Sequence, residues 1–123
     1  MKIEKFTDLT VWQKAHELTL LVYGLTERFP AREKFGITSQ IRRAAASPVA
    51  NIAEGFGRRT TAELLRSLQI ARGEIEETRH FLILSRDLGF VSPADFERGA
   101  GSCDTVGKLI NALATSLRKR VNG

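Results

Sequence analysis

The chain has 123 residues, 42% of them hydrophobic and 27% charged, with a formal net charge of +5. This length predicts one domain over residues 1–123, and the sequence has no apolar stretch long enough to span a membrane. The single cysteine, Cys103, excludes an intramolecular disulfide, and the N-terminus lacks the apolar run of a signal peptide, so a cytoplasmic protein is expected. The positive charge permits a nucleic-acid partner without establishing one.

A first helix is predicted over about residues 8–29. Its apolar positions advance in steps of four and three until Pro30, which stops a helix: Val11, Ala15, Leu18, Val22, Leu25 and Phe29. A second face carries Trp12, His16, Thr19 and Tyr23. The helix is therefore expected to be covered on two sides, as in a bundle that also self-associates.

A second helix is predicted over about residues 37–56 and a third over about 61–88. The second has inward positions at Ile37, Ile41, Ala45, Pro48 and Ile52. The third begins with a capping box made by Thr60 and Glu63, and Gly89 stands where a left-handed C-terminal cap is needed. Its expected inward positions are Leu64, Leu68, Ala71, Ile75, Thr78, Leu82 and Ser85.

A fourth helix is predicted over about residues 93–119, because Ser92 and Pro93 form a typical helix start. Irregular backbone is expected in its early part, since Gly99, Gly101 and Gly107 each cost about 1 kcal/mol relative to alanine inside a helix. Four helices with short connections and no strand pattern predict an all-α, antiparallel up-down four-helix bundle.

The stretch NIAEGFGRR, residues 51–59, has the glycines and arginines of an anion site in the wrong order. A phosphate loop places glycines before a lysine at a helix start, whereas these glycines follow a helix and no lysine accompanies them. The stretch is interpreted as a polar segment that packs the second helix against its neighbours and ends it. Gly55 and Gly57 are expected to let the chain turn and to expose Arg58 and Arg59.

Two polar residues of this stretch need partners. Glu54 can reach Arg58 four residues later. Asn51 can hold a neighbouring helix or the carbonyl group freed by Pro48.

Metal binding and nucleophilic catalysis are not favoured, and no cofactor is predicted. Glu77 and His80 form one pair of the kind that binds iron in bundles, but the only other histidine, His16, has no matching glutamate. Cys103 lies among apolar neighbours without a nearby base, which indicates a buried structural thiol. No catalytic residue is assigned.

The candidate nucleic-acid-binding residues are seven arginines: Arg42, Arg43, Arg58, Arg59, Arg72, Arg79 and Arg86. The last three recur every seven residues, so they form a positive line about 20 Å long on one helix face. Glu76 stands between Arg72 and Arg79 at helical spacing, so the same line also fits an ordinary ion-paired surface.

Four motifs in order resemble the four helix bundle protein family, also called the 23S rRNA intervening-sequence protein family: LTVWQKAHELTLLVYGLTERFP, EKFGITSQIRRAA, NIAEGFGR and LQIARGEIEET. The resemblance covers nearly the whole chain and weakens after Gly89. It implies a bundle assembled as a homopentamer, without enzymatic activity, and some members are encoded in rRNA intervening sequences. A related group, the accessory variability determinants of diversity-generating retroelements, is a basic pentamer that works with a reverse transcriptase and binds nucleic acid.

The positions that match the most recognisable ones of the family are Gln40, Arg43, Asn51, Glu54, Gly55 and Arg58. No catalytic role attaches to them. Two positions depart from the family pattern: Ser47 is followed directly by Pro48, and the usual Gly-Ser pair reads Gly73-Glu74. The extra charge of Glu74 is expected to reduce local attraction for nucleic acid.

Three hypotheses follow from the sequence. The first is a non-enzymatic homo-oligomer, expected as a pentamer, that binds RNA or DNA through basic surface residues as an accessory factor. The second is a protein-interaction scaffold that binds no nucleic acid. The third is a metal or small-molecule enzyme, which requires bound metal despite the missing histidines.

Overall fold

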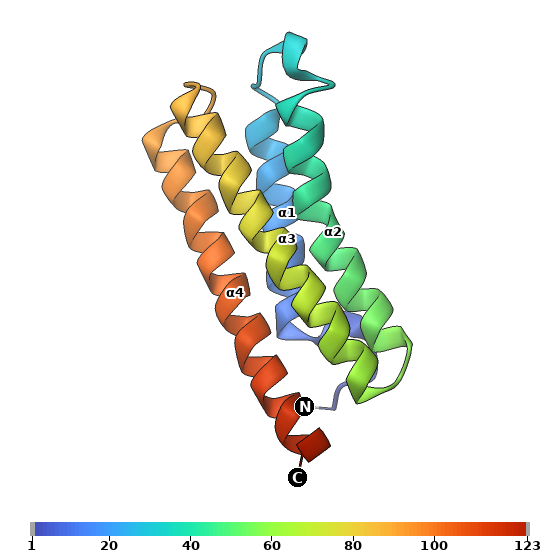
Figure 1. The fold of residues 1–123 in the computed structure, drawn as a ribbon. Helices are drawn as coiled ribbons and strands as arrows, with labels where there is room; N and C mark the ends of the chain where they lie inside the picture. The colour runs from blue at the N-terminus through green and yellow to red at the C-terminus, as the bar shows by residue number, and fades with distance from the viewer. Residues whose placement is uncertain (1, 123) are drawn as a thin grey trace.

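The computed structural model describes residues 2–122, with side chains up to residue 121. Consecutive helices run in opposite directions and pack side by side as a bundle (Figure 1). The helices are α1 (Thr10–Thr26), α2 (Ile37–Gly57), α3 (Thr61–Asp87) and α4 (Pro93–Asn122), with short 3-10 helices η1 (Phe6–Asp8) and η2 (Ala31–Glu33). No strand occurs within residues 2–122, which confirms the all-α prediction.

The core forms where the apolar stripes of the four helices meet. Leu18 of α1, Ile41 of α2, Leu68 of α3 and Ile110 of α4 belong to one continuous cluster and are almost completely buried. Every inward position expected for α3 is buried, including the polar Thr78 and Ser85. The hydroxyl groups of these two residues donate to backbone carbonyls one turn earlier, so their burial leaves no donor unpaired.

The first helix is shorter than predicted at both ends. It begins after the turn η1 and stops at Thr26, whose backbone carbonyl accepts from Phe29 N at 3.1 Å in a tighter turn. Phe29 is buried, as expected of the stripe, but it lies outside the helix and packs with Ile37 and Val91 in a small second cluster. The apolar stripe thus continues into the turn because tertiary packing, not helical geometry, buries Phe29.

The prediction of irregular backbone in the early part of α4 is wrong, because the helix is continuous through all three glycines. Gly99 is buried, and a Cβ atom there would lie 2.9 Å from Cδ1 of Leu82 on α3. The missing side chain therefore lets α3 and α4 approach closely. Packing against α3 offsets the low helix propensity of glycine.

The expectation that Gly55 and Gly57 form the turn after α2 is also wrong. Both residues are helical, and a Cβ atom at Gly55 would lie 2.5 Å from Cβ of Ser67, so Gly55 permits close packing of α2 on α3. The turn is made by Arg59, which has a positive φ of 64°. Thr60 then caps α3, its hydroxyl oxygen accepting from Glu63 N at 3.1 Å, as half of the predicted capping box.

Candidate nucleic-acid interface

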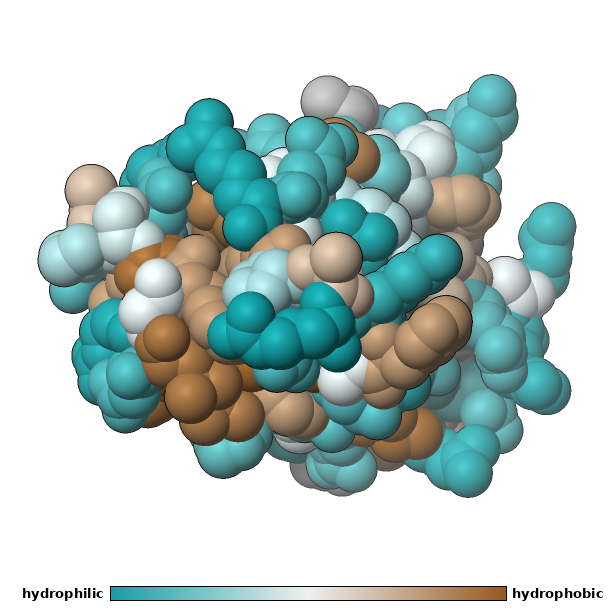
Figure 2. Space-filling view, turned by 90° about the horizontal axis from the view of Figure 1, so that it is seen from above, coloured by the Kyte–Doolittle hydropathy of each residue, from teal (hydrophilic) through white to brown (hydrophobic). Residues whose placement is uncertain are grey.

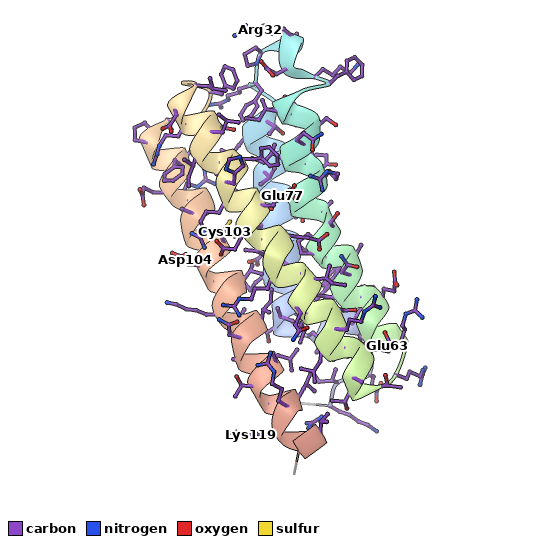
Figure 3. All side chains as sticks on the ribbon, viewed as in Figure 1. Arg32, Glu63, Glu77, Cys103, Asp104 and Lys119 are labelled. Atoms are coloured by element: carbon purple, nitrogen blue, oxygen red, sulfur yellow. The ribbon has the colours of Figure 1, made fainter. Side chains whose placement is uncertain are left out.

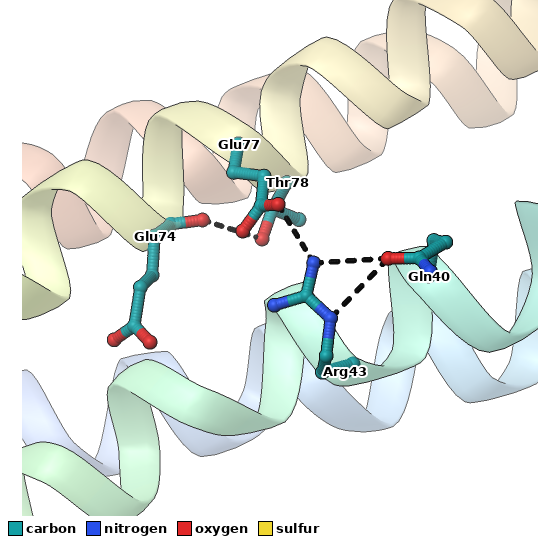
Figure 4. A network of polar contacts seen from close by, with 5 residues as sticks. All are labelled: Gln40, Arg43, Glu74, Glu77 and Thr78. Carbon is teal, nitrogen blue, oxygen red and sulfur yellow. Dashed lines mark hydrogen bonds and ion pairs between the residues drawn. The ribbon is translucent and has the colours of Figure 1, made fainter.

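Arg43 is held between α2 and α3 by a polar network (Figure 4). Its Nη2 atom donates to the Glu77 carboxylate at 2.7 Å and to Gln40 Oε1 at 3.1 Å. The hydrogen bond to Glu77 raises the pKa of Arg43 above its ordinary value, so the guanidinium remains charged. The Glu77 carboxylate thus orients the guanidinium of Arg43 and neutralises part of the charge of this guanidinium.

Asn51 and Glu54, the two polar residues of the NIAEGFGRR stretch, both have partners. The amide of Asn51 donates to the carboxylate of Glu74 on α3 at 2.8 Å, so it holds the neighbouring helix. Glu54 pairs with Arg58 at 3.1 Å, the spacing of four residues predicted from the sequence. The polar stretch thus connects α2 to α3 and covers the end of α2.

The arginine line of α3 lies beside acidic groups. Arg79 pairs with Asp104 of α4 at 2.9 Å and with Glu76 at 3.4 Å. Arg72 lines a hollow together with Arg79 and the same two carboxylates. Arg79 therefore belongs to an ion-paired contact between α3 and α4, and Arg72 lies beside it.

Arg86 is also engaged. Its Nε atom lies 3.0 Å from a carboxylate oxygen of Asp87, and its guanidinium lies 4.4 Å from the ring centroid of Phe96. The interpretation of the line as an ion-paired surface fits these contacts better than a continuous track for a phosphate backbone.

A different group of residues gathers three cations, of which Arg43 is the one paired with a carboxylate, that of Glu77. A hollow of about 440 Å³ opens between α1, the loop before α2 and α2 itself. We call it the basic hollow, and its lining residues are Tyr23, Lys34, Phe35, Thr38, Ser39, Arg42, Arg43 and Ala46. All of its charged lining residues are cations.

Arg42 is fixed in the wall of the basic hollow. Its Nε atom donates to the hydroxyl oxygen of Thr26 at 2.7 Å, and its guanidinium lies 4.6 Å from the ring centroid of Tyr23. Neither contact neutralises its charge. A hydroxyl group and an aromatic face thus orient this cation and leave it able to attract an anion.

Three other hollows of the described chain are lined by charged residues of both signs. The hollow beside the α3–α4 loop includes Glu27 and Asp95 among its lining residues. The hollow near Arg59 includes Glu4. The basic hollow therefore differs from them in having cations alone among its charged walls.

The structure brings Arg42 and Arg43 together in the basic hollow, while Arg58 and Arg59 lie at the opposite end of α2 and the other three lie on α3. Sequence reasoning missed Lys34 and Phe35. A usable signal was present, because Phe35 is a large apolar residue in a charged loop and belongs to no helical stripe.

The residues considered for metal or nucleophile chemistry have other surroundings. Glu77 is paired with Arg43, and within the described chain no three potential metal ligands of the His, Cys, Asp and Glu types cluster together. Cys103 is fully buried, and burial raises its pKa to about 11, which disfavours the reactive thiolate. Helices capable of crossing a bilayer are likewise not found between residues 2 and 122.

Four helices in antiparallel order around one core define a four-helix bundle protein. Residues 7–112 match the sequence model of the 23S rRNA-intervening sequence protein family, and the chain belongs to this family. The assignment expected from the four motifs is thus confirmed.

One solved structure with a similar fold comes from Bacteroides thetaiotaomicron VPI-5482 and is described as a protein of unknown function from the S23 ribosomal protein family. It superimposes with a TM-score of 0.78 at 24% identity, over 85% of this chain and 95% of that chain. At this identity the likeness shows the fold alone. No curated protein matches the chain.

Proposed function

We propose that this protein is a non-enzymatic, homo-oligomeric bundle that binds RNA or DNA as an accessory factor. The observation that carries the proposal is the basic hollow, in which Lys34, Arg42 and Arg43 are the charged lining residues. Nucleic-acid phosphates are attracted to such clusters of cations, and neutralising them releases counterions. The net charge of +5 adds a long-range attraction of the same sign.

Self-association is supported by the second face of α1. Trp12 is only half-buried and stacks on the exposed ring of His16, with centroids 4.9 Å apart. Together with Ala46, Ala50 and Ala53 of α2 these rings line an apolar hollow of about 330 Å³. We propose that a second copy covers this face, and the family resemblance favours a closed ring of five.

A ring would strengthen weak binding. Each copy presents one basic hollow, and a nucleic acid held by one copy is at high effective concentration for the next. Modest contacts at each hollow can therefore sum to useful affinity.

The test is fluorescence anisotropy with labelled single-stranded RNA, duplex RNA and duplex DNA, at low and near-physiological salt. Lys34→Glu should weaken binding and lower its salt dependence. Lys119→Glu is the matched control because it makes the same charge change at the opposite end of the bundle (Figure 3). Equal loss in both variants would indicate only general charge attraction, and no binding at low salt would overturn the proposal.

A second candidate surface is the α2–α3 turn, so the double variant Arg58→Ala, Arg59→Ala is tested as well. It removes two cations from the α2–α3 turn, away from the basic hollow. Loss of binding in this variant, with Lys34→Glu unaffected, would place the interface at that turn.

The oligomer is tested separately by sedimentation velocity. Five copies of the 13.7 kDa chain would have a mass of about 68.5 kDa. Ala50→Arg places a long charged side chain in the apolar hollow and should dissociate the assembly, whereas Ala62→Arg on an exposed part of α3 should not. A monomer in the unmodified protein would remove this part of the proposal and leave a single-copy binding protein.

The second candidate function is a protein-interaction scaffold without nucleic-acid binding. The apolar hollow on α1 and α2 favours it, since such a surface also suits another protein. Absence of nucleic-acid binding together with a monomeric state would favour this alternative.

A further inference from the structure

The structure assigns to the basic hollow a preference for single-stranded nucleic acid, with one unpaired base stacked on Phe35 and the adjoining phosphate held by the cations. This inference rests on the proposed function and makes it more specific. It depends on the juxtaposition of an exposed aromatic ring, cations and the exposed hydroxyl group of Ser39 around one hollow.

The side chain of Phe35 is unusually exposed to solvent for a phenylalanine. It is 88% exposed, in the loop that leads into α2. Figure 2 views the end of the bundle that carries this loop, where apolar groups lie among hydrophilic ones. Bases of every kind have a flat apolar face, so an exposed ring of this type offers a stacking platform without sequence preference.

Cations lie beside the aromatic rings of the hollow. Lys34 Nζ is 5.5 Å from the ring centroid of Phe35, and Arg42 covers one face of Tyr23. A nucleotide has groups that complement both features, because its flat base can stack on an aromatic ring and its phosphate can pair with a cation. One nucleotide can therefore use the ring and the cations together.

Hydroxyl groups complete the polar wall. Thr38 and Ser39 lie in the first turn of α2, and the partial positive charge of a helix N-terminus favours an anion there. Thr38 is only 9% exposed, and its Oγ1 atom has no hydrogen-bond partner among the described residues. Protein atoms cover Thr38 Oγ1, so the hydroxyl group of the exposed Ser39 is the one that a bound phosphate or sugar oxygen can reach.

One carboxylate lies near this end of α2. Glu33 Oε1 accepts from Ile37 N at 3.5 Å, a long contact at the edge of hydrogen bonding. Glu33 is not part of the lining of the basic hollow.

Duplexes cannot use the aromatic part of this site. Their base faces are covered by stacking, so a duplex offers only phosphates and groove edges to a protein. The hollow has the size of a small-ligand pocket, typically about 300–1,000 Å³. Single strands, whose bases can be turned outward, therefore match its shape and chemistry better.

The test compares Phe35→Ala with the unmodified full chain, using a labelled single-stranded RNA of mixed sequence and the duplex of the same sequence. Because Phe35 is exposed, the variant should fold, and circular dichroism checks this. Single-strand affinity should fall about 10-fold, the loss expected of one base–aromatic stack, while duplex affinity should stay nearly unchanged. Phe35→Tyr should retain binding and Phe35→Leu should not.

Leu88→Ala is the matched control, since Leu88 is also exposed, at 51%, just after α3. This variant should bind both probes like the unmodified chain. Equal losses in Leu88→Ala and Phe35→Ala would overturn the assignment of a stacking platform to Phe35.

The remaining outcomes separate this inference from the proposed function. If the unmodified chain binds no nucleic acid, the proposed function fails and this inference fails with it. If the unmodified chain binds both probes and Phe35→Ala changes neither, only this inference is overturned. If Phe35→Ala shifts the sedimentation coefficient and weakens both probes equally, Phe35 is a contact between copies and the inference is also overturned.

Discussion

The side-chain amide of Asn51 on α2 donates a hydrogen bond to the carboxylate of Glu74 on α3, at 2.8 Å. Both residues are half-buried. The carboxylate of Glu74 is therefore used within the bundle. Hydrogen bonds to charged groups stabilise more than neutral ones, so this pair connects the two helices effectively.

Asn51→Asp should destabilise the protein near neutral pH. The substitution removes the donor and sets a second carboxylate against Glu74, so a loss of about 1–3 kcal/mol in the free energy of unfolding is expected. Urea unfolding near neutral pH measures the loss, and Asn51→Ala, which adds no charge, should destabilise the protein less. An equal loss in both variants would contradict the expected repulsion.

Gly55→Ala should destabilise the bundle although alanine favours helices. The new Cβ atom would lie 2.5 Å from Cβ of Ser67, so α2 and α3 must separate or shift, at a cost of about 1–3 kcal/mol. Gly73→Ala is the control, because a Cβ atom there meets nothing within 4 Å. It should stabilise the protein by about 0.8–1 kcal/mol. Thermal or urea unfolding of the two variants measures these changes in stability. Equal changes in both variants would contradict the close approach of α2 and α3 at Gly55.

Cys103 should make the protein less stable in alkali. Burial raises the pKa of this thiol from 9.0 to about 11, so the unfolded chain loses the proton first as the pH rises. The contribution is intact below pH 9 and decreases between pH 9 and about 11, by about 2–3 kcal/mol in total. Urea unfolding across this range should show a steeper decline for the unmodified chain than for Cys103→Ala. Parallel curves would show that the thiol does not contribute.

Arg59→Gly should stabilise the α2–α3 turn. Arg59 has a φ of 64°, which costs a residue with a side chain roughly 1–2 kcal/mol, and glycine avoids this cost. The greater freedom of glycine in the unfolded chain offsets part of the gain, so an increase of about 0.5–1 kcal/mol is expected. Arg58→Gly is the control, since Arg58 has a φ of −77° and also loses its pair with Glu54. It should destabilise the protein, and a loss in both variants would contradict the expected strain.

Most of the fold was predictable because each helix has a strong apolar repeat. The repeat in α3 identifies every buried position from Leu64 to Ser85, and Thr60 marks its start. The errors occurred where tertiary packing overrides local propensity. Phe29 is buried although it lies in a turn. Gly99 and Gly55 lie inside helices because a neighbouring helix occupies the space that a side chain would need.

The candidate site was less predictable from the sequence. Helical spacing places Arg72, Arg79 and Arg86 on one face, but it cannot show that Asp104, far along the chain, pairs with Arg79. Nor does spacing indicate that Lys34 and Phe35 lie beside Arg42, because a loop has no periodicity. These relationships depend on how the helices are assembled.

The antiparallel order of the helices places the two ends of the described chain at the same end of the bundle, opposite the α1–α2 loop (Figure 1). An affinity tag, dye or surface tether attached at either end would therefore project away from the basic hollow. Immobilised protein should keep this hollow accessible, which makes surface-based binding assays compatible with the solution measurements.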